Sequence, residues 1–418
     1  MIPVRFILAD LRRLWAGSLV IVLLIGLATA LGIAVGIQER ALRLGSARAA
    51  DRFDVIVGAA GSETQLVLSS VFLQPAPLTL LPGAVLKKLS EDPRVAWAAP
   101  VGFGDSFQGS PIVGTTNEFL TDKGQRPLAE GEIFRGRTDA VIGALVDLRQ
   151  GDTVKPIHGQ PGEGGHSHDE LAYTVTGRLA PTGTPWDRAI LVPIETVWSI
   201  HGMGAPASAG TAEADDHDHD HDGAQDHAAA DHLGPPWHDD IPGVPAIIVK
   251  PRSIANAYQI RQEYRADTTV GVFPAEVLTR LYATLGDARL VLTAIAIGTQ
   301  ALVGAAVVLV SVVHLSQRRR QIGALRALGA PRGAIFGVVW VELLLLIGLG
   351  VGLGVGLGYV GAKVAASVFT RESGIVLPVT LEAGDIGFAG LLLLVAAVIA
   401  LVPAWLAYRQ PPAAALRA

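Results

Sequence analysis

The chain has 418 residues, of which 50% are hydrophobic and only 17% are charged, and its mean hydropathy is +0.42. Soluble proteins typically carry about 25% charged residues, so this composition indicates long apolar segments beside a polar region. The absence of cysteine excludes disulfides, thiolate metal sites and cysteine catalysis. A net charge of −5, without a basic stripe of interleaved aromatic residues, argues against a nucleic-acid-binding surface.

Four long apolar runs can each cross a bilayer core of about 30 Å. The first follows Arg12 and Arg13 and contains Ala28-Thr29-Ala30, which has the small-x-small form of a signal-peptide cleavage site. The apolar run continues past that site to Ile37, which favours an uncleaved helix. The predicted transmembrane helices are 15–37, 290–315, 334–362 and 386–408.

The short loops between these runs predict the orientation of the chain. The loop 316–333 holds five arginines and no acidic residue, whereas 363–385 holds three acidic residues against one lysine and one arginine. By the positive-inside rule, the loop 316–333 is cytoplasmic, together with both termini, 1–14 and 409–418. Residues 38–289 and the loop 363–385 are then outside the cytoplasm.

The region 38–289 is large enough for a soluble domain of mixed structure. Short β-rich runs bounded by Gly or Pro predict strands, and Ser253 is placed to cap a helix through Arg265. The sequence thus predicts an α-helical membrane protein with four transmembrane helices, one plus three, and a large α+β domain between the first and second. The predicted strands are 53–57, 95–101, 111–114, 140–142, 173–177, 189–192 and 246–249, and the other predicted helices are 82–90 and 277–286.

Two polar insertions, 159–170 and 201–240, interrupt this region, and neither has the apolar residues to bury a core. Ten of the eleven histidines lie between His158 and His238, and the second insertion alternates Asp with His. Imidazole and carboxylate groups suit zinc or another divalent transition metal, as ligands of a sensor or capture arm. The alternative is a solvated loop that binds metal only adventitiously. The candidate ligands are His166, His168, His217, His219, His221, His227, His232 and His238.

The third predicted span contains two rows of glycine at a spacing of four. One row is Gly350, Gly354 and Gly358, and the other is Gly348, Gly352 and Gly356. Rows of small residues let helices approach closely, so we expect tight packing here, within a subunit or across a dimer.

Polar residues are scarce in the predicted spans. Glu342 is costly in a span and should face the bundle or the interface, as a packing acid or as part of an ion pathway. With Gln300 and His314 it makes too few polar groups to line a hydrophilic channel. The chain has no P-loop, no nucleophile elbow and no HExxH motif, so it offers no case for an enzyme.

The basic loop between the second and third spans carries a short amphipathic pattern. Ile322, Leu325 and Leu328 recur at i, i+3 and i+6, and Gly329-Ala330-Pro331 then ends the helix. The pattern is typical of a cytoplasmic docking helix. The alternative is an ordinary positive-inside loop.

Three stretches carry a resemblance to a known family. They are RRRQIGALRALGAPRGAIFGVVWVE, the C-terminal VPAWLAYRQPPAAALR, and the weaker pair LAEGEIFRGRTDAVIGALVDLRQGD and YTVTGRLAPTGTPWDRAILVPIE. With the one-plus-three topology, the chain resembles the FtsX-like/MacB-type ABC transporter permeases, a group that includes the LolC and LolE lipoprotein-release subunits. Gln321 departs from the glutamate that is frequent in the family, and the 201–240 insertion is not a general family feature.

The resemblance implies a coupling helix in 316–333 that docks on a separate ATP-binding subunit, with ATP bound by that partner. It also implies a bacterial inner-membrane location in contact with membrane lipid, a permease homodimer, a periplasmic partner or substrate protein, and no nucleic acid. Other readings are a periplasmic metal-binding sensor or capture module, an FtsX-type regulator of periplasmic hydrolases, and a lipoprotein-release permease. The implied coupling residues are Arg320, Gln321, Ile322, Leu325, Arg326 and Leu328.

Overall fold

The structure, a computed structural model, divides into two compact units. The first comprises 1–45, 283–370 and 377–418, and the second comprises 46–282 and 371–376. The described residues are 12–13, 15–158, 171–203, 233–284 and 329–409, with single residues and short stretches between 290 and 312.

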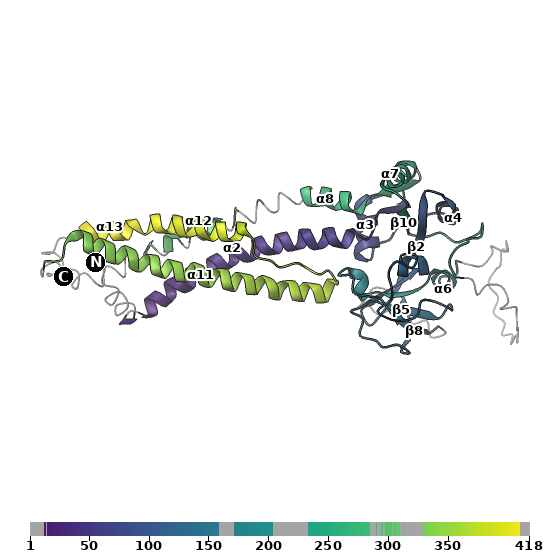
Figure 1. The fold of residues 1–418 in the computed structure, drawn as a ribbon, viewed down its shortest axis with the longest axis horizontal. Helices are drawn as coiled ribbons and strands as arrows, with labels where there is room; N and C mark the ends of the chain where they lie inside the picture. The colour runs from purple at the N-terminus through teal and green to yellow at the C-terminus, as the bar shows by residue number, and fades with distance from the viewer. Residues whose placement is uncertain are drawn as a thin grey trace, which may run out of the picture. The chain divides into compact units, whose positions relative to one another are not determined.

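In the described part of the chain, three helices are long and apolar enough to cross a membrane (Figure 1). They are α2 (Trp15–Ala50), α11 (Arg332–Ser373) and the run Ala383–Leu406, which comprises α12 (Ala383–Ile399) and most of α13 (Leu401–Arg409). The predicted span 290–315 contains a shorter apolar helix, Ile297–Ala306. Some residues within that range are not among the described ones. Three of the four predicted spans therefore lie on helices of sufficient length and apolar composition to cross a membrane, and the fourth span stays a prediction.

Helices α2 and α11 are much longer than a bilayer requires. They contain 36 and 42 residues, which at 1.5 Å per residue gives about 54 Å and 63 Å against a hydrocarbon core of about 30 Å. No proline interrupts either helix. Each continues beyond its predicted span, α2 from 37 to 50 and α11 from 362 to 373, and both lead along the chain into the second unit.

The second unit is built on one mixed sheet, which confirms a large sheet domain after the first span. Its described strands number eleven, in the order β11-β1-β10-β2-β3-β9-β5-β8-β4, with β6 on β8 and β7 on β2. The pairs β3–β9 and β5–β8 are parallel and the other pairs antiparallel. The strands are β1 (Val55–Ala59), β2 (Val95–Phe107), β3 (Ser110–Thr115), β4 (Glu130–Gly131), β5 (Asp139–Ile142), β6 (Thr153–Val154), β7 (Ile157–His158), β8 (Tyr173–Arg178), β9 (Ile190–Pro193), β10 (Ala246–Pro251) and β11 (Thr269–Val272).

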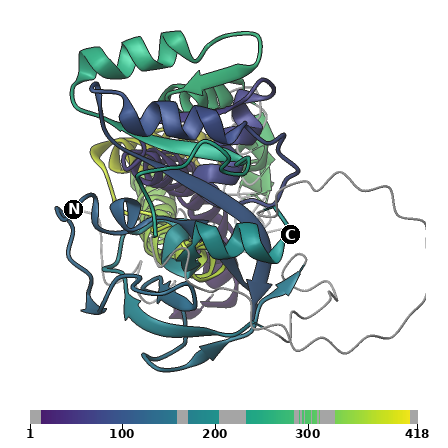
Figure 2. The same cartoon turned by 90° about the vertical axis from the view of Figure 1, so that its right-hand side faces the viewer.

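Helices cover both faces of this sheet (Figure 2). In β1, Val55 and Val57 join one buried cluster while Ile56 joins the other, as the two-residue period of a strand requires. The first cluster is covered by α4 (Gly83–Glu91), α6 (Ile194–Ile200) and α7 (Ile254–Glu263). The second is covered by α3 (Glu63–Phe72), α5 (Asn117–Thr121), α8 (Pro274–Thr284) and the 3-10 turn η1 (Pro185–Arg188).

Strand β2 changes partner along its length. Its first half pairs with β10 and its second half with β3, and the register shifts between Gly102 and Asp105. Gly102 and Gly114 lie under α6, where an added Cβ would come within 2.7 Å and 2.9 Å of the Ile194 side chain. These two glycines let α6 rest directly on the sheet.

The local predictions for this domain are largely confirmed. The predicted strands correspond to β1, β2, β3, β5, β8, β9 and β10, and Ser253 caps α7 by accepting a hydrogen bond of 3.2 Å from the amide of Asn256. The sequence did not predict the helices α3, α5 and α6 or the strands β4, β6, β7 and β11. Helix α6 is rich in β-branched residues and directly follows β9, so its sequence pattern predicts a continuation of the strand.

Candidate functional site

One glycine row of α11 lies directly against α2 in the first unit. A Cβ added at Gly354 would lie 2.5 Å from the Cβ of Thr29 and 2.6 Å from the carbonyl oxygen of Gly26. Gly350 and Gly358 have similar approaches to α2 at 2.8 Å and 2.7 Å. Between apolar helices in lipid, close van der Waals packing replaces the hydrophobic drive, so this row fixes how the two helices meet.

The second glycine row has no such neighbours. Gly348, Gly352 and Gly356 have nothing among the described residues within 4 Å of an added Cβ. The two rows on the same helix therefore provide a matched pair of test positions.

We expect Gly354→Ala to destabilise the helix unit by about 1–3 kcal/mol, the usual range for overpacking, because backbone and Thr29 must both move. Thermal unfolding of the purified protein in detergent measures the change. Gly352→Ala is the control and should not lower the unfolding temperature, because its Cβ meets no neighbour and alanine favours the helix. Equal effects of the two substitutions would contradict the packing.

An ion-pair cluster connects α2 to the start of α12. The Arg40 guanidinium donates to Asp385 Oδ2 at 2.7 Å, pairs with Glu382 at 3.1 Å, and donates to the carbonyl oxygen of Thr380 at 3.0 Å. The Asp385 side chain is only 9% exposed, and it also closes a capping box with Glu382 at the helix N-terminus. Removal of either partner would leave a largely buried charge uncompensated.

Arg40→Leu should therefore cost about 3 kcal/mol of stability, whereas the double variant Arg40→Leu/Asp385→Leu should recover part of that loss. A double-mutant cycle on the unfolding temperature gives the coupling. Arg43→Leu, at an exposed position of the same helix, is the control and should be nearly neutral. Additive single effects would show that the pair contributes nothing.

The described span residues enclose an apolar cavity of about 560 Å³. Its polar lining groups are Thr29 and Gln300, and the Gln300 side chain donates to the carbonyl oxygen of Ala28 at 2.7 Å. Glu342 is 4% exposed, so it faces the inside of the unit, which is one of the two positions the sequence suggested. Thr29 and Gln300 are too few to make the cavity a hydrophilic pathway.

In the second unit, the loop Thr182–Arg188 is the point where separate parts of the chain meet. The buried Asp187 carboxylate shapes it, accepting from the amide of Gly183 at 2.7 Å and from both the amide and the hydroxyl of Thr182. Trp186 then enters the core fully buried, with its ring centroid 4.6 Å from that of Phe119 and 6.0 Å from that of Phe53.

The same loop receives the segment that follows α11. The amide of Val376 donates to the carbonyl oxygen of Gly183 at 3.1 Å. Gly374 has a φ of +76°, and a Cβ there would lie 2.9 Å from the Cα of Pro185. Only glycine combines this left-handed conformation with so close an approach.

The residues that follow α2 pack against the rings of Trp186 and Phe119. Phe53 follows α2 and packs in the core, and the Arg52 guanidinium lies 4.6 Å from the centroid of Phe119 while donating to its carbonyl oxygen at 3.1 Å. Burial lowers the pKa of the Arg52 guanidinium to about 10, which still leaves it charged at neutral pH. The Tyr282 hydroxyl of α8 donates to Ser46 of α2 at 2.6 Å.

The sequence did not identify this junction. Its visible signal is the run Thr182-Gly183-Thr184-Pro185-Trp186-Asp187, in which turn residues surround a large aromatic. Nothing in that run reveals that residues 371–376, nearly two hundred positions later, lie against it.

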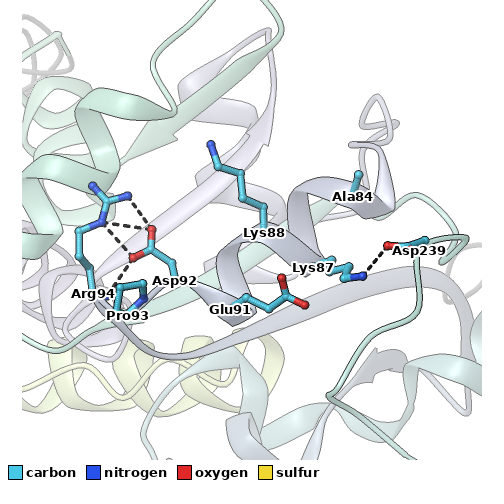
Figure 3. Close-up of a pocket in the computed structure, with 8 residues that line it drawn as sticks. All are labelled: Ala84, Lys87, Lys88, Glu91, Asp92, Pro93, Arg94 and Asp239. Carbon is cyan, nitrogen blue, oxygen red and sulfur yellow. Dashed lines mark hydrogen bonds and ion pairs between the residues drawn. The ribbon is translucent and has the colours of Figure 1, made fainter.

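A charged depression of about 600 Å³ lies beside α4 (Figure 3). Each of its three cations is compensated: Lys87 pairs with Asp239, Lys88 with Glu263, and Arg94 with both Asp92 and Glu263. The network links α4 to α7 and to the segment before β10, so we assign it a structural role.

The network predicts a pH dependence of the domain. The hydrogen bond from Lys88 and then that from Arg94 hold the pKa of Glu263 below its ordinary 4.5. A lowered carboxylate pKa contributes stability that is present above the unfolded value and lost as the pH falls through the folded one. Glu263→Gln should therefore reduce the loss of thermal stability between pH 5 and pH 3, in about that window.

Glu91→Gln is the matched control for this measurement. Glu91 lines the same depression and forms no ion pair among the described side chains, so its replacement should leave the acid dependence unchanged. An unchanged acid limb in Glu263→Gln would contradict the assignment.

Most of the sequence-predicted sites lie outside the described residues. This applies to all six predicted coupling residues and to every candidate metal ligand except His238, which is exposed in the loop before Asp239. Within the described stretches, no group of three or more His, Asp or Glu side chains is arranged to hold a metal ion. The predicted His tract and coupling helix remain predictions.

Three described helices that are long and apolar enough to cross a membrane, together with a separate mixed-sheet domain, are the architecture expected of a membrane protein with a large folded domain. Residues 293–413 match the family model described as FtsX-like permease C-terminal. The match includes the basic segment, α11, α12 and α13, so the predicted FtsX-like resemblance is confirmed for this part of the chain. No curated protein matches the chain significantly.

Two solved structures show weak likeness to the chain. The periplasmic region of MacB from Actinobacillus actinomycetemcomitans is 9% identical, with a TM-score of 0.31, over 55% of this chain and 92% of that one. The extracellular domain of the noncanonic ABC-type transporter YknZ from Gram-positive bacteria is 9% identical, with a TM-score of 0.29, over 52% and 98%. Scores at this level carry no argument about function.

Proposed function

We propose that this chain is the permease subunit of a MacB-type ABC transporter in a bacterial inner membrane. A separate ATP-binding subunit docks on the cytoplasmic loop 316–333, and its ATP-driven movement is transmitted to the sheet domain on the other side. The chain itself catalyses no reaction, and it works as a homodimer with two ATPases.

The observation that carries this proposal is the length and ending of two helices. Both α2 and α11 are longer than the hydrocarbon core of a bilayer is thick, by about 20–30 Å. The residues that follow each helix pack against the sheet domain. Phe53 after α2 packs on Trp186, and Val376 after α11 bonds to Gly183 in the same loop. Uninterrupted helices whose following residues both contact the loop Thr182–Arg188 are suited to carrying movement from the spans to a domain.

The chemistry of the spans supports transmission over passage through a pore. The polar groups Thr29, Gln300 and Glu342 are buried or bonded, and the cavity beside them is apolar. Such a lining offers no hydrated path for a polar substrate. The substrate is then handled by the domain outside the membrane.

Replacing Leu325 with Asp and Arg326 with Glu together should abolish stimulation of the ATPase subunit by the permease in nanodiscs, because the docking stripe loses its apolar contact and its charge reverses. The sheet domain should keep its unfolding temperature. Arg13→Glu, at an exposed position outside the docking loop, is the charge control and should leave the stimulation unchanged. Unchanged stimulation would contradict the docking role.

Val376→Pro tests the transmission step separately, since it removes the amide that donates to Gly183. The chain has no cysteine, so a single cysteine at the exposed Ala255 of α7 can carry a fluorophore. ATP should change its signal in the wild type and not in Val376→Pro, while ATPase stimulation persists. A preserved signal would show that movement does not pass through this loop.

A second function, metal capture by the His/Asp tract, is favoured by how the tract is bounded. The amide of Gly234 donates to Glu195 of α6 at 2.7 Å, and Trp237 packs on Trp198 of the same helix with centroids 5.8 Å apart. The chain leaves for the tract from the end of α6 and returns onto it. Zinc calorimetry on the full chain, with and without residues 204–232, tests this: equal zinc uptake by both forms would remove it.

A further inference from the structure

The apolar cavity of the helix unit is deep on one side and open on the other. Its volume of about 560 Å³ lies in the usual range of ligand pockets, about 300–1,000 Å³. Ile347 and Val351 of α11 line its inner wall and are 2% and 3% exposed. Ile297 of the second span and Val395 of α12 line it as well, and they are 63% and 45% exposed. The cavity therefore reaches the outer surface of the unit, where predicted spans meet lipid.

Small side chains keep this space open. Ala301, Gly304 and Ala305 line it from the second span, and Ala396 lines it from α12. A Cβ added at Gly304 would have one neighbour within 4 Å among the described residues, the Ile399 Cδ1 at 3.7 Å, which is ordinary contact. Protein interiors are packed as densely as organic crystals and contain few voids larger than a water molecule. A space of this size between apolar helices therefore calls for an occupant.

The lining excludes water and charged molecules as that occupant. None of the described residues that line the cavity is charged. Thr29 and Gln300 are its polar groups, and the Gln300 amide already donates to the carbonyl oxygen of Ala28 at 2.7 Å. A buried water needs about two to four polar partners, and even a cavity of about 150 Å³ with an apolar lining stays dry and takes up apolar molecules. The occupant is therefore apolar.

The cavity is elongated along the helices. Its lining residues run from Leu392 to Pro403 on α12 and α13, and from Ile297 to Val308 on the second span. At 1.5 Å per residue, each run covers about 16 Å. This is about half of a hydrocarbon core of about 30 Å, and hence the depth that the acyl chains of one leaflet cover. The length of the cavity thus matches one extended acyl chain.

We propose that this cavity binds one acyl chain of a membrane phospholipid. The chain enters from the bilayer at the open side and lies between α2, α11, the second span and α12. The headgroup stays outside, because no described lining residue offers it a charge. The bound chain supplies the van der Waals contacts that an empty cavity lacks. The proposal does not depend on the proposed transport function.

Filling the cavity with protein side chains tests the proposal. Ala396→Phe and Gly304→Leu each place apolar atoms in the space that the acyl chain would occupy. The full chain, extracted from membranes in glyco-diosgenin, should retain one phospholipid per chain in native mass spectrometry, and each filled variant should lose it. Leu391→Phe is the control, because Leu391 is 58% exposed on α12 and does not line the cavity. The control should retain the phospholipid.

A thermal measurement separates binding from folding. Palmitoyl lysophosphatidylethanolamine, added to delipidated protein, should raise the unfolding temperature of the wild type and the control, since a ligand of the folded state stabilises it. The filled variants should be folded without lipid and should not respond to it. Palmitoyl lysophosphatidylglycerol should act as the ethanolamine lipid does. The octanoyl analogue should bind more than about tenfold more weakly, because it buries fewer methylene groups.

Three results would overturn the proposal. The first is a wild-type chain that retains no phospholipid and does not respond to the added lipid. The second is a folded, filled variant that retains phospholipid as the wild type does. The third is a thermal response that follows the charge of the headgroup and not the length of the chain. If one filled variant does not fold, the other decides.

Discussion

The burial of Trp186 is the interaction on which the sheet domain's connections to its flanking helices depend. Its ring packs against Phe119 and against Phe53, the residue that fixes the end of α2. The loop that carries it is held by Asp187 and also receives Val376, after α11. The loop Thr182–Arg188 therefore contacts two chain segments, one that follows α2 and one that follows α11.

The membrane unit is held by interactions of a different kind. In lipid an apolar face gains nothing from burial against another apolar face, so contact area and polar bonds decide helix association. Gly354 and its row give α11 and α2 that contact area, and Gln300 adds a hydrogen bond to the backbone of α2. The Arg40–Asp385 pair fixes the start of α12 on the same helix, and it is strong because little water reaches it. Helix α2 is thus the common partner of α11, of α12 and of the segment that carries Gln300.

In the sheet domain, too, glycines allow close packing and ion pairs connect helices. Gly102 and Gly114 bring α6 close enough to the sheet for His201 to meet Asp105. Elsewhere in the domain, α4 and the residues after it are connected to α7 by ion pairs of Lys88 and Arg94 with Glu263. These pairs are partly exposed, so salt and acid weaken them. The His201–Asp105 contact is largely shielded from water, whereas the Arg94–Lys88–Glu263 network is open to it.

The sequence by itself determined the properties that depend on neighbouring residues. Hydropathy predicted the apolar helices, and β-rich runs predicted most strands. Ser253 predicted the cap of α7, and the basic stretch with the C-terminal end predicted the FtsX-like resemblance. Only the tertiary structure decided which distant residues meet. Sequence spacing gave two equivalent glycine rows, and the fold buries Gly354 against Thr29 while leaving Gly352 open. Strand order and helix placement decide three such contacts: Trp186 with Phe53, Val376 with Gly183, and Asp105 with His201. Packing across the whole domain sets that order and placement, so the local sequence does not reveal them.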